Sequence, residues 1–253
     1  MLATAMALPD EYERQQRWRR YGDALKQVPL VRGQRVLDLG CGVGAASALF
    51  AAAGADVIGV DVDDALLLRA RELHAELRFE KHDVGALDAS TFGRVDGIWA
   101  SFVAAYFSDL PSFVARLREL LVDGGWVALV EIDDLLGHEP RSAAFAADIA
   151  GFYAWARAQG GYGFLHGRAL APALRDAGFE LVHEGTLEDG ELSFRGPASA
   201  DVVEAWRSRF TRMGGMRTYY GDRFGEVSGE ILAALQAPSH RSLCRVDIVV
   251  ARR

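Results

Sequence analysis

The residues best suited to chemistry in this chain are an acid and a set of glycines that lie close together. The stretch reads Asp38-Leu39-Gly40-Cys41-Gly42-Val43-Gly44, and it stands between an apolar run at 35–39 and a helical pattern at 45–53. Glycines let a ligand come close to the backbone, and the N-terminus of a helix offers unpaired N–H groups. The pattern is therefore typical of a loop that binds a nucleotide-like cofactor.

Two classes of cofactor compete for this loop. Gly40, Gly42 and Ala45 satisfy the loose dinucleotide pattern G-x-G-x-x-A. A carboxylate at Asp38, however, repels a pyrophosphate and attracts an ammonium group, such as the amino-acid end of S-adenosyl-L-methionine. We therefore favour the second class and keep a nicotinamide-dependent oxidoreductase as the less favoured alternative.

Two more acids follow the next two predicted strands. Asp61 ends the strand predicted at 56–61, where it can accept both hydroxyls of a ribose. Asp83 follows the strand predicted at 77–82 and can accept from an adenine amino group. Three acids at the ends of three successive strands indicate a binding site and not merely a structural turn.

These motifs together resemble those of a known enzyme family. The D-x-G-x-G loop, Gly59-Val60-Asp61-Val62-Asp63 and Lys81-His82-Asp83-Val84 are similar in order and spacing to class I S-adenosyl-L-methionine-dependent methyltransferases of the small-molecule type (methyltransferase type 11/25-like), over roughly residues 30–135. The resemblance implies S-adenosyl-L-methionine as cofactor and S-adenosyl-L-homocysteine as product. It also implies the residues that hold the cofactor: Asp38 and Gly40 at the methionine end, Asp61 at the ribose, Asp83 with Val84 at the adenine, and Ser101 and Phe102 beside the cofactor. Cys41, Gly42 and Val62, in the same motifs, are further cofactor-binding residues.

Apolar runs and helical patterns alternate along most of the chain, which predicts an α/β fold. Strands are predicted at 35–39, 56–61, 77–82, 97–101, 126–132, 179–186 and 243–251. Helices are predicted at 10–28, 45–53, 63–74, 110–122, 141–159, 168–177, 199–213 and 222–236. The resemblance implies a Rossmann-like seven-stranded sheet, with the last strand antiparallel between strands five and six, flanked by helices and carrying a helical cap.

We expect one methyltransferase domain over 1–253, with an N-terminal helical arm at 1–30 and cap insertions at 134–177 and 190–240. The arm is locally basic on a chain with a net charge of −7. We expect it to close over the bound cofactor, although simple packing of an amphipathic helix explains its pattern equally well. The candidate closing residues are Tyr12, Trp18, Arg19, Arg20 and Tyr21.

The overall composition excludes several other classes. With 35 acidic and 28 basic residues, the chain lacks the positive charge of a protein that binds a phosphate backbone. No run approaches the ~20 apolar residues of a membrane span, and residues 1–9 do not form a convincing leader. The two cysteines, Cys41 and Cys244, have no metal-site spacing. We expect a cytoplasmic monomer or homodimer that binds neither nucleic acid nor membrane and needs no metal.

The methyl acceptor is expected to be a small organic molecule. Within the family that the chain resembles, enzymes that methylate nucleobases carry a Pro-Pro-Tyr run after strand four, and this chain has Ala100-Ser101-Phe102-Val103 there. Catechol-type enzymes have a metal-binding acid at the position of Ser101, so their set of metal ligands is incomplete here. Asp133-Asp134 is a weak residual candidate for binding a metal. The predicted cap is rich in aromatic residues, which suits a partly apolar acceptor, although most of them could be core. The predicted substrate-binding residues are Phe152, Trp155, Tyr162, Arg168, Trp206 and Tyr219.

Four residues are candidates for acid–base work or for contact with the reacting groups. A histidine is the usual base for a hydroxyl, so His166 is the first choice and His138 the second, with a surface or capping role at least as well supported. Glu131 lies inside a predicted strand, where a buried carboxylate is costly unless it is paired; it could act as the base or bond a neighbouring loop. Tyr106 follows strand four closely enough to touch substrate or cofactor.

These observations predict methyl transfer to a small molecule, with oxygen slightly ahead of nitrogen or carbon as the acceptor atom. Only two of the 28 basic residues are lysines, and this bias together with the large cap suggests bacterial secondary metabolism. The alternatives are a non-methylating enzyme of the same fold, such as a cyclase or pericyclase, and a non-enzymatic partner subunit.

Overall fold

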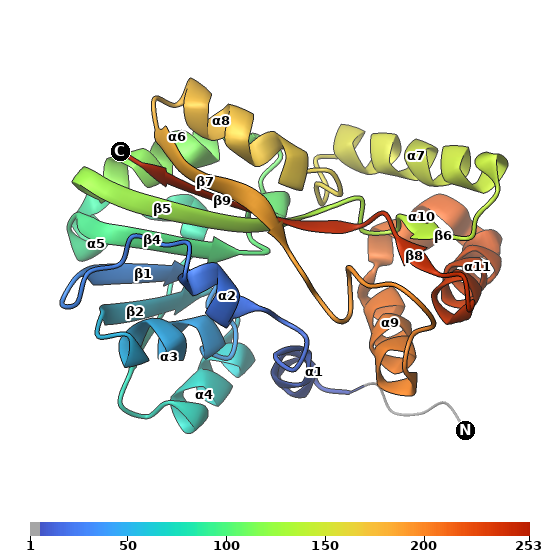
Figure 1. Ribbon diagram of the computed structural model, residues 1–253, viewed down its shortest axis with the longest axis horizontal. Coiled ribbons are helices and arrows are strands. Elements are labelled where there is room, and N and C mark those ends of the chain that lie inside the picture. The colour runs from blue at the N-terminus through green and yellow to red at the C-terminus, as the bar shows by residue number, and fades with distance from the viewer. Residues whose placement is uncertain (1–5) are drawn as a thin grey trace.

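A seven-stranded mixed sheet forms the centre of the structure, a computed structural model that describes residues 6–253 (Figure 1). Its strands are β1 (Arg35–Leu39), β2 (Asp56–Asp61), β3 (Arg78–Lys81), β4 (Val95–Ser101), β5 (Leu121–Asp133), β7 (Glu180–Leu187) and β9 (Arg245–Arg252). Their order is β3-β2-β1-β4-β5-β9-β7, and β9 alone runs antiparallel to both of its neighbours. The predicted seven-stranded fold, with the last strand reversed between the fifth and the sixth, is confirmed.

Helices cover both faces of the sheet, because the central strands are apolar on both sides. On one face lie α2 (Tyr21–Leu25) and α3 (Ala45–Ala52), and on the other lie α6 (Leu110–Leu120) and α8 (Leu170–Asp176). The helix α4 (Asp64–Leu73) packs on β2 and β3. Short helical turns are α5 (Ala89–Phe92), η1 (Val84–Ala86), η2 (Ala104–Tyr106), η3 (Gly167–Ala169) and η4 (Gly221–Arg223).

The cap lies beyond the carboxyl ends of the parallel strands, on the right of Figure 1. It consists of α7 (Ala143–Ala158), α9 (Ala200–Arg212), α10 (Gly214–Tyr220) and α11 (Phe224–Gln236), with a small sheet of β6 (His138–Glu139) and β8 (Arg241–Ser242). One continuous apolar cluster extends from Trp99 in β4 and Trp126 in β5 to Phe152 and Trp206 in the cap. The predicted segment 134–177 includes α8, which packs on α6 and β7 and thus belongs to the sheet layers.

The N-terminal arm differs from its prediction. The single helix expected over 10–28 is two helices, α1 (Leu8–Gln15) and α2, with residues 16–20 outside either of them. The chain leaves the helix where Trp18 packs on Gly190 and where Arg19 turns inward to bond two carboxylates of the cap. Residues 1–5 of the predicted arm lie outside the described residues. The helix α10 and the small sheet were not predicted, and no helix within residues 6–253 is long and apolar enough to span a membrane.

The packing of Trp126 on Gly97 gives a direct test of the fold. A Cβ on Gly97 would lie 2.2 Å from Cζ2 of Trp126, in a region without free space. We therefore expect Gly97→Ala to lower the free energy of unfolding by ~1–3 kcal/mol. Gly229→Ala is the control, because Gly229 lies in α11 with no neighbouring atom within 4 Å of its Cβ position. It should change stability little or raise it by up to ~1 kcal/mol. Urea unfolding measures both, and equal effects would contradict this packing.

Candidate functional site

The loop between β1 and α3 has the backbone conformation that its glycines allow. Gly40, Gly42 and Gly44 have φ values of +67°, +54° and +82°. The N–H groups of Gly40 and Cys41 donate to the carbonyl of Val60, at 2.7 and 3.0 Å, which ties the loop to β2. A Cβ on Gly40 would lie 2.3 Å from Cγ2 of Val103, so the loop has no room for a side chain there. The Cys41 side chain is buried in an apolar cluster, so only its backbone can serve the site.

Asp61, at the end of β2, faces this loop. Its Oδ2 accepts from the N–H of Gly42 at 2.9 Å, and its Oδ1 accepts from the N–H of Asp63 at 3.0 Å. Each oxygen of a carboxylate can accept a further hydrogen bond. The side chain is therefore held in one orientation beside the glycines with capacity to accept two hydroxyls. Val62, the next residue, is exposed and offers apolar surface at the same edge.

Asp38 is buried under the same loop. Only 2% of the residue is exposed, and the hydroxyl of Ser47 in α3 donates to its Oδ2 at 2.5 Å. Burial raises the pKa of Asp38 to about 7; the hydrogen bond from Ser47 opposes this shift, and the charge of Asp61 adds to it. A positive charge brought beside Asp38 would favour its ionised form. The contact with an ammonium group stays a prediction.

The ends of β3 and β4 carry the remaining predicted cofactor residues. Asp83 is exposed and accepts from the N–H of Gly85 at 2.7 Å, while Val84 is buried. Ser101 lies within 3.2 Å of the Tyr21 hydroxyl. Phe102 has a φ of +59°, which is strained for a bulky residue and typical of functional sites. These strand ends thus present fixed polar and apolar groups at one edge of the sheet.

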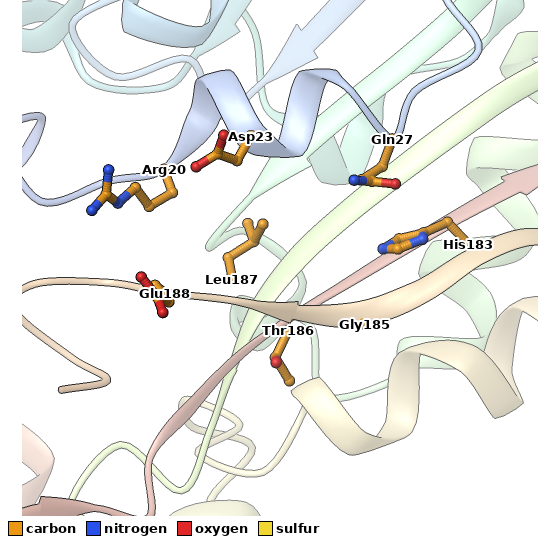
Figure 2. A pocket seen from close by; sticks show the side chains of 8 residues that line it. All are labelled: Arg20, Asp23, Gln27, His183, Gly185, Thr186, Leu187 and Glu188. Carbon is orange, nitrogen blue, oxygen red and sulfur yellow. The ribbon is translucent and has the colours of Figure 1, made fainter. Parts of the chain in front are cut away.

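The arm covers the glycine loop through Tyr12. A Cβ on Gly42 would lie 3.2 Å from Cδ2 of Tyr12, so the phenol ring rests on the loop. Arg20 is not brought to this loop: Figure 2 shows it lining a separate cavity of about 280 Å³ between the arm and β7. Trp18, which was also expected to close the cofactor site, is not brought to this loop either, because its ring packs on Gly190. The arginine that turns inward is Arg19, whose guanidinium lies 4.9 Å from the centre of the Phe102 ring.

Buried ion pairs join the arm to the cap. Arg19 contacts Asp189 at 2.6 Å and Glu191 at 2.8 Å, and Glu191 also contacts Arg209 at 2.5 Å. A second group joins Glu11 of α1 to Arg212 and to the Ser208 hydroxyl of α9. The carboxylates in both groups are almost completely buried. Removing one partner of such a pair typically costs ~3–5 kcal/mol, so these contacts fix the arm over the glycine loop.

Glu131 is completely buried near the end of β5. Its Oε2 accepts from the N–H of Ala105 and its Oε1 from the N–H of Ile132, both at 2.9 Å. Burial raises the pKa of Glu131 to about 7, and hydrogen bonds from these two N–H groups and from the Tyr162 side chain oppose the shift. Tyr106 is 67% exposed and meets Tyr162 edge to face at 5.2 Å. Glu131, Tyr106 and Tyr162 therefore form one group at the carboxyl edge of the sheet.

The two histidines predicted as bases both brace loops. Nε2 of His166 lies 3.2 Å from the carbonyl oxygen of Phe107, and burial lowers the pKa of its ring. His138 is buried, with Nδ1 3.2 Å from Nε2 of His240, and its ring meets Trp206 edge to face. Burial, followed by the charge of His240, lowers the pKa of His138 to about 3. The structure thus corrects the expectation for His138, whereas that for His166 stays a prediction, and Glu131 is a further candidate proton acceptor.

Several residues predicted to bind substrate are packing residues. Phe152 and Trp206 are buried in the core, and the Trp206 indole donates to the carbonyl of Glu191 at 3.0 Å. Trp155 and Tyr219 pack on each other with ring centres 5.4 Å apart. The expectations for Phe152 and Trp206 are therefore corrected, whereas those for Trp155 and Tyr219 stay predictions and Tyr162 remains at the site.

Arg168 is also used structurally. It forms a two-pronged ion pair with Asp133, at 2.7 and 2.8 Å, and Arg245 contacts the same carboxylate at 3.0 Å. The expectation that Arg168 grips an acidic substrate is corrected, because its guanidinium already has this partner. Asp133, the weak metal candidate, is paired with two cations, and no group of metal-ligating side chains occurs within residues 6–253.

Four residues of the buried ion pairs were not predicted from the sequence: Glu11, Glu191, Arg209 and Arg212. Their partners lie up to 201 positions away along the chain, so no local spacing reveals them. One signal was available: Arg209 interrupts the apolar face that Val202 and Trp206 form on α9. A charged residue in such a face needs a buried partner.

Comparisons with known proteins agree with this geometry. A family model described as "Methyltransferase domain" matches residues 11–184. The chain is 33% identical to the nocamycin O-methyltransferase of Saccharothrix syringae, over 81% of this chain and 79% of that protein. It is 32% identical to the trans-aconitate 2-methyltransferase of Methylobacterium radiotolerans, over 77% and 68%. Among solved structures, phosphoethanolamine N-methyltransferase 2 of Haemonchus contortus in complex with S-adenosyl-L-methionine has a TM-score of 0.58 at 18% identity, over 93% of this chain and 52% of that chain.

The buried Asp38 predicts a pH-dependent affinity for S-adenosyl-L-homocysteine. The amino-acid end of this molecule carries an ammonium group, as that of S-adenosyl-L-methionine does. Below a pKa of about 7 the carboxyl is protonated, and binding the ammonium requires its ionisation. The dissociation constant at pH 6 should therefore be about tenfold higher than at pH 8. Asp38→Asn should bind more weakly and lose this dependence. Ser47→Ala should move the transition to higher pH, because it removes the hydrogen bond that favours the ion.

Isothermal titration at several pH values measures these affinities. Asp56→Asn serves as the control, because Asp56 is exposed at the opposite end of β2. An Asp38→Asn protein with the pH profile of the wild type would contradict the assignment of Asp38.

Proposed function

Because the chain belongs to the family of S-adenosyl-L-methionine-dependent methyltransferases, we propose that it transfers a methyl group to an oxygen atom of a small organic molecule in bacterial secondary metabolism. The observation that carries this proposal is the buried carboxyl of Glu131, with a pKa raised to about 7, beside Tyr106 and Tyr162. A general base works best when its pKa lies near the working pH. Such a group suits the removal of a proton from a hydroxyl.

The residues present fit the cofactor. The glycine loop leaves its backbone free of side chains, and Asp61 can accept two ribose hydroxyls beside it. Asp38 would face the ammonium, while Asp83 and Val84 would border the adenine. Tyr12 from the arm would close the site over the loop. This enclosure would exclude water and keep the reacting groups in line.

The reaction needs only alignment and the removal of one proton. Bound S-adenosyl-L-methionine supplies a methyl group on a sulfonium, and its transfer to the acceptor oxygen leaves S-adenosyl-L-homocysteine. Glu131 accepts the proton that the acceptor hydroxyl releases, and the hydrogen bonds from Ala105 and Ile132 hold its carboxylate in place. The Tyr162 side chain, which bonds Glu131, orients the acceptor.

We further propose that the chain works as one methyltransferase domain, as a monomer or homodimer in the cytoplasm. The apolar cluster shared by the sheet and the cap supports a single folding unit. The net charge of −7 supports a small-molecule acceptor over a nucleic acid. Similarity to the nocamycin O-methyltransferase of Saccharothrix syringae supports oxygen as the acceptor atom.

Transfer of labelled methyl from S-adenosyl-L-methionine tests the proposed reaction. We expect an O-methylated product from a panel of hydroxylated aromatics and carboxylic acids that includes 3,4-dihydroxybenzoate and trans-aconitate, with the position identified by mass spectrometry. Label on nitrogen or carbon, or no transfer to any member of the panel, would contradict O-methylation.

Glu131→Gln tests the role of the carboxyl with an acceptor of the panel that is methylated on a hydroxyl group. Because a general base typically contributes about 10²–10⁴ in rate, kcat should fall at least a hundredfold. In the wild type, kcat should rise as the pH passes through about 7, since the base acts in its ionised form. Glu184→Gln is the matched control, because Glu184 is exposed on β7 and forms an ion pair with Arg175. A kcat in Glu131→Gln close to that of the control would rule out Glu131 as the base.

A further inference from the structure

The guanidinium of Arg209 is only partly satisfied by the protein. Its Nη2 contacts Glu191 at 2.5 Å, and its Cζ atom lies 5.4 Å from the centre of the Trp206 ring. The Nε atom is buried and has no hydrogen-bond partner among residues 6–253. Buried donors in native proteins are nearly always paired, so an unpaired N–H of a charged group requires an explanation.

Arg209 shares its carboxylate partner with a second arginine. Glu191 is its ion-pair partner, but the same carboxylate contacts Arg19 as well. Asp189 pairs with Arg19 and not with Arg209 within the described chain. The two arginines and the two carboxylates of this cluster balance in charge. The unused capacity of Arg209 is its Nε–H, which can donate to an additional oxygen.

The surroundings of Arg209 place it at the acceptor side of the proposed site. Glu191 joins Arg209 to Arg19, whose guanidinium lies 4.9 Å from the centre of the Phe102 ring. The charge of Arg209 also opposes the rise that burial causes in the pKa of Tyr12, Tyr106 and Tyr162. Tyr12 rests on the glycine loop, and Tyr162 bonds the carboxyl of Glu131. Arg209 therefore reaches the same group of side chains from the cap that Glu131 reaches from the sheet.

These three tyrosines also indicate the shape of the ligand. Aromatic rings present flat apolar faces on which a planar molecule can stack. Tyr106 is largely exposed, so part of this aromatic surface is not used for packing inside the protein. A planar ligand with an oxygen directed to Arg209 and a hydroxyl directed to Glu131 would satisfy both polar groups.

We propose that Arg209 determines acceptor specificity by donating its Nε–H to a carboxylate of the acceptor, which is a planar hydroxylated carboxylic acid. This inference rests on the proposed function, because it concerns the same site. The carboxylate accepts the hydrogen bond that Nε of Arg209 has free, while Glu131 receives the proton of the hydroxyl. No bond of Arg209 forms or breaks in the reaction, so its role is recognition.

Binding of two probes that differ only in the carboxylate tests the proposal. The probes are 3,4-dihydroxybenzoate and catechol, titrated calorimetrically into the protein saturated with S-adenosyl-L-homocysteine. We expect the wild type to bind the acid at least tenfold more tightly, since hydrogen bonds between charged groups are the strong ones. Equal binding, or no binding of either probe, overturns the proposal.

Arg209→Lys isolates the contribution of the Nε–H. Lysine keeps a positive charge beside Glu191 but lacks the second donor at the Nε position. The preference for the acid should fall to less than threefold, while the affinity for S-adenosyl-L-homocysteine and the melting temperature stay close to those of the wild type. Arg207→Lys, on the exposed face of the same helix, should keep the full preference. An unchanged preference in Arg209→Lys overturns the proposal.

This readout is independent of methyl transfer. If labelled methyl never reaches an oxygen although the acid binds through Arg209, the proposed reaction fails and the recognition stands. If O-methylation occurs without any dependence on Arg209, the recognition fails and the reaction stands.

Discussion

The buried ion pairs between the arm and the cap are the constraint on which the site depends. Carboxylates and guanidinium groups can be removed from water only when they are paired, and Glu11, Asp189 and Glu191 find their partners between the arm and the cap. The arm therefore has to lie over the carboxyl edge of the sheet for these charges to be satisfied. Because Tyr12 belongs to that arm, satisfying the charges also covers the loop.

Enclosure explains the two unusual carboxyl groups at this edge. Asp38 and Glu131 come from different strands, yet burial raises the pKa of both to about 7. Each is held by hydrogen bonds and lacks a cationic side chain as its partner among the described contacts. In our account their counterparts are the ligands: the ammonium of the cofactor for Asp38 and the proton of the acceptor for Glu131. Burial destabilises the ionised form of both carboxyl groups, and the raised pKa values that result suit binding and catalysis.

The fold and the cofactor loop could be predicted from the sequence because their signals are local. Asp38, the glycines and Asp61 occur at fixed distances from strands whose apolar pattern is clear, and the strand order follows from the family resemblance. The acceptor side could not be predicted in the same way. Phe152 and Trp206 look like a substrate pocket in the sequence but are core, and Arg209 is recognised only through Glu191, 18 positions away. The prediction for His138 was wrong for a similar reason, because the imidazole of His240 that contacts it is distant in sequence.

A crystal structure of the protein with S-adenosyl-L-homocysteine tests the central claim most directly. We predict that both ribose hydroxyls lie within hydrogen-bond distance of Asp61, that the ring of Tyr12 covers the ligand, and that the Glu11–Arg212 pair is intact. A ligand bound away from the glycine loop, or an arm displaced from the cap with Glu11 and Arg212 apart, would contradict the account.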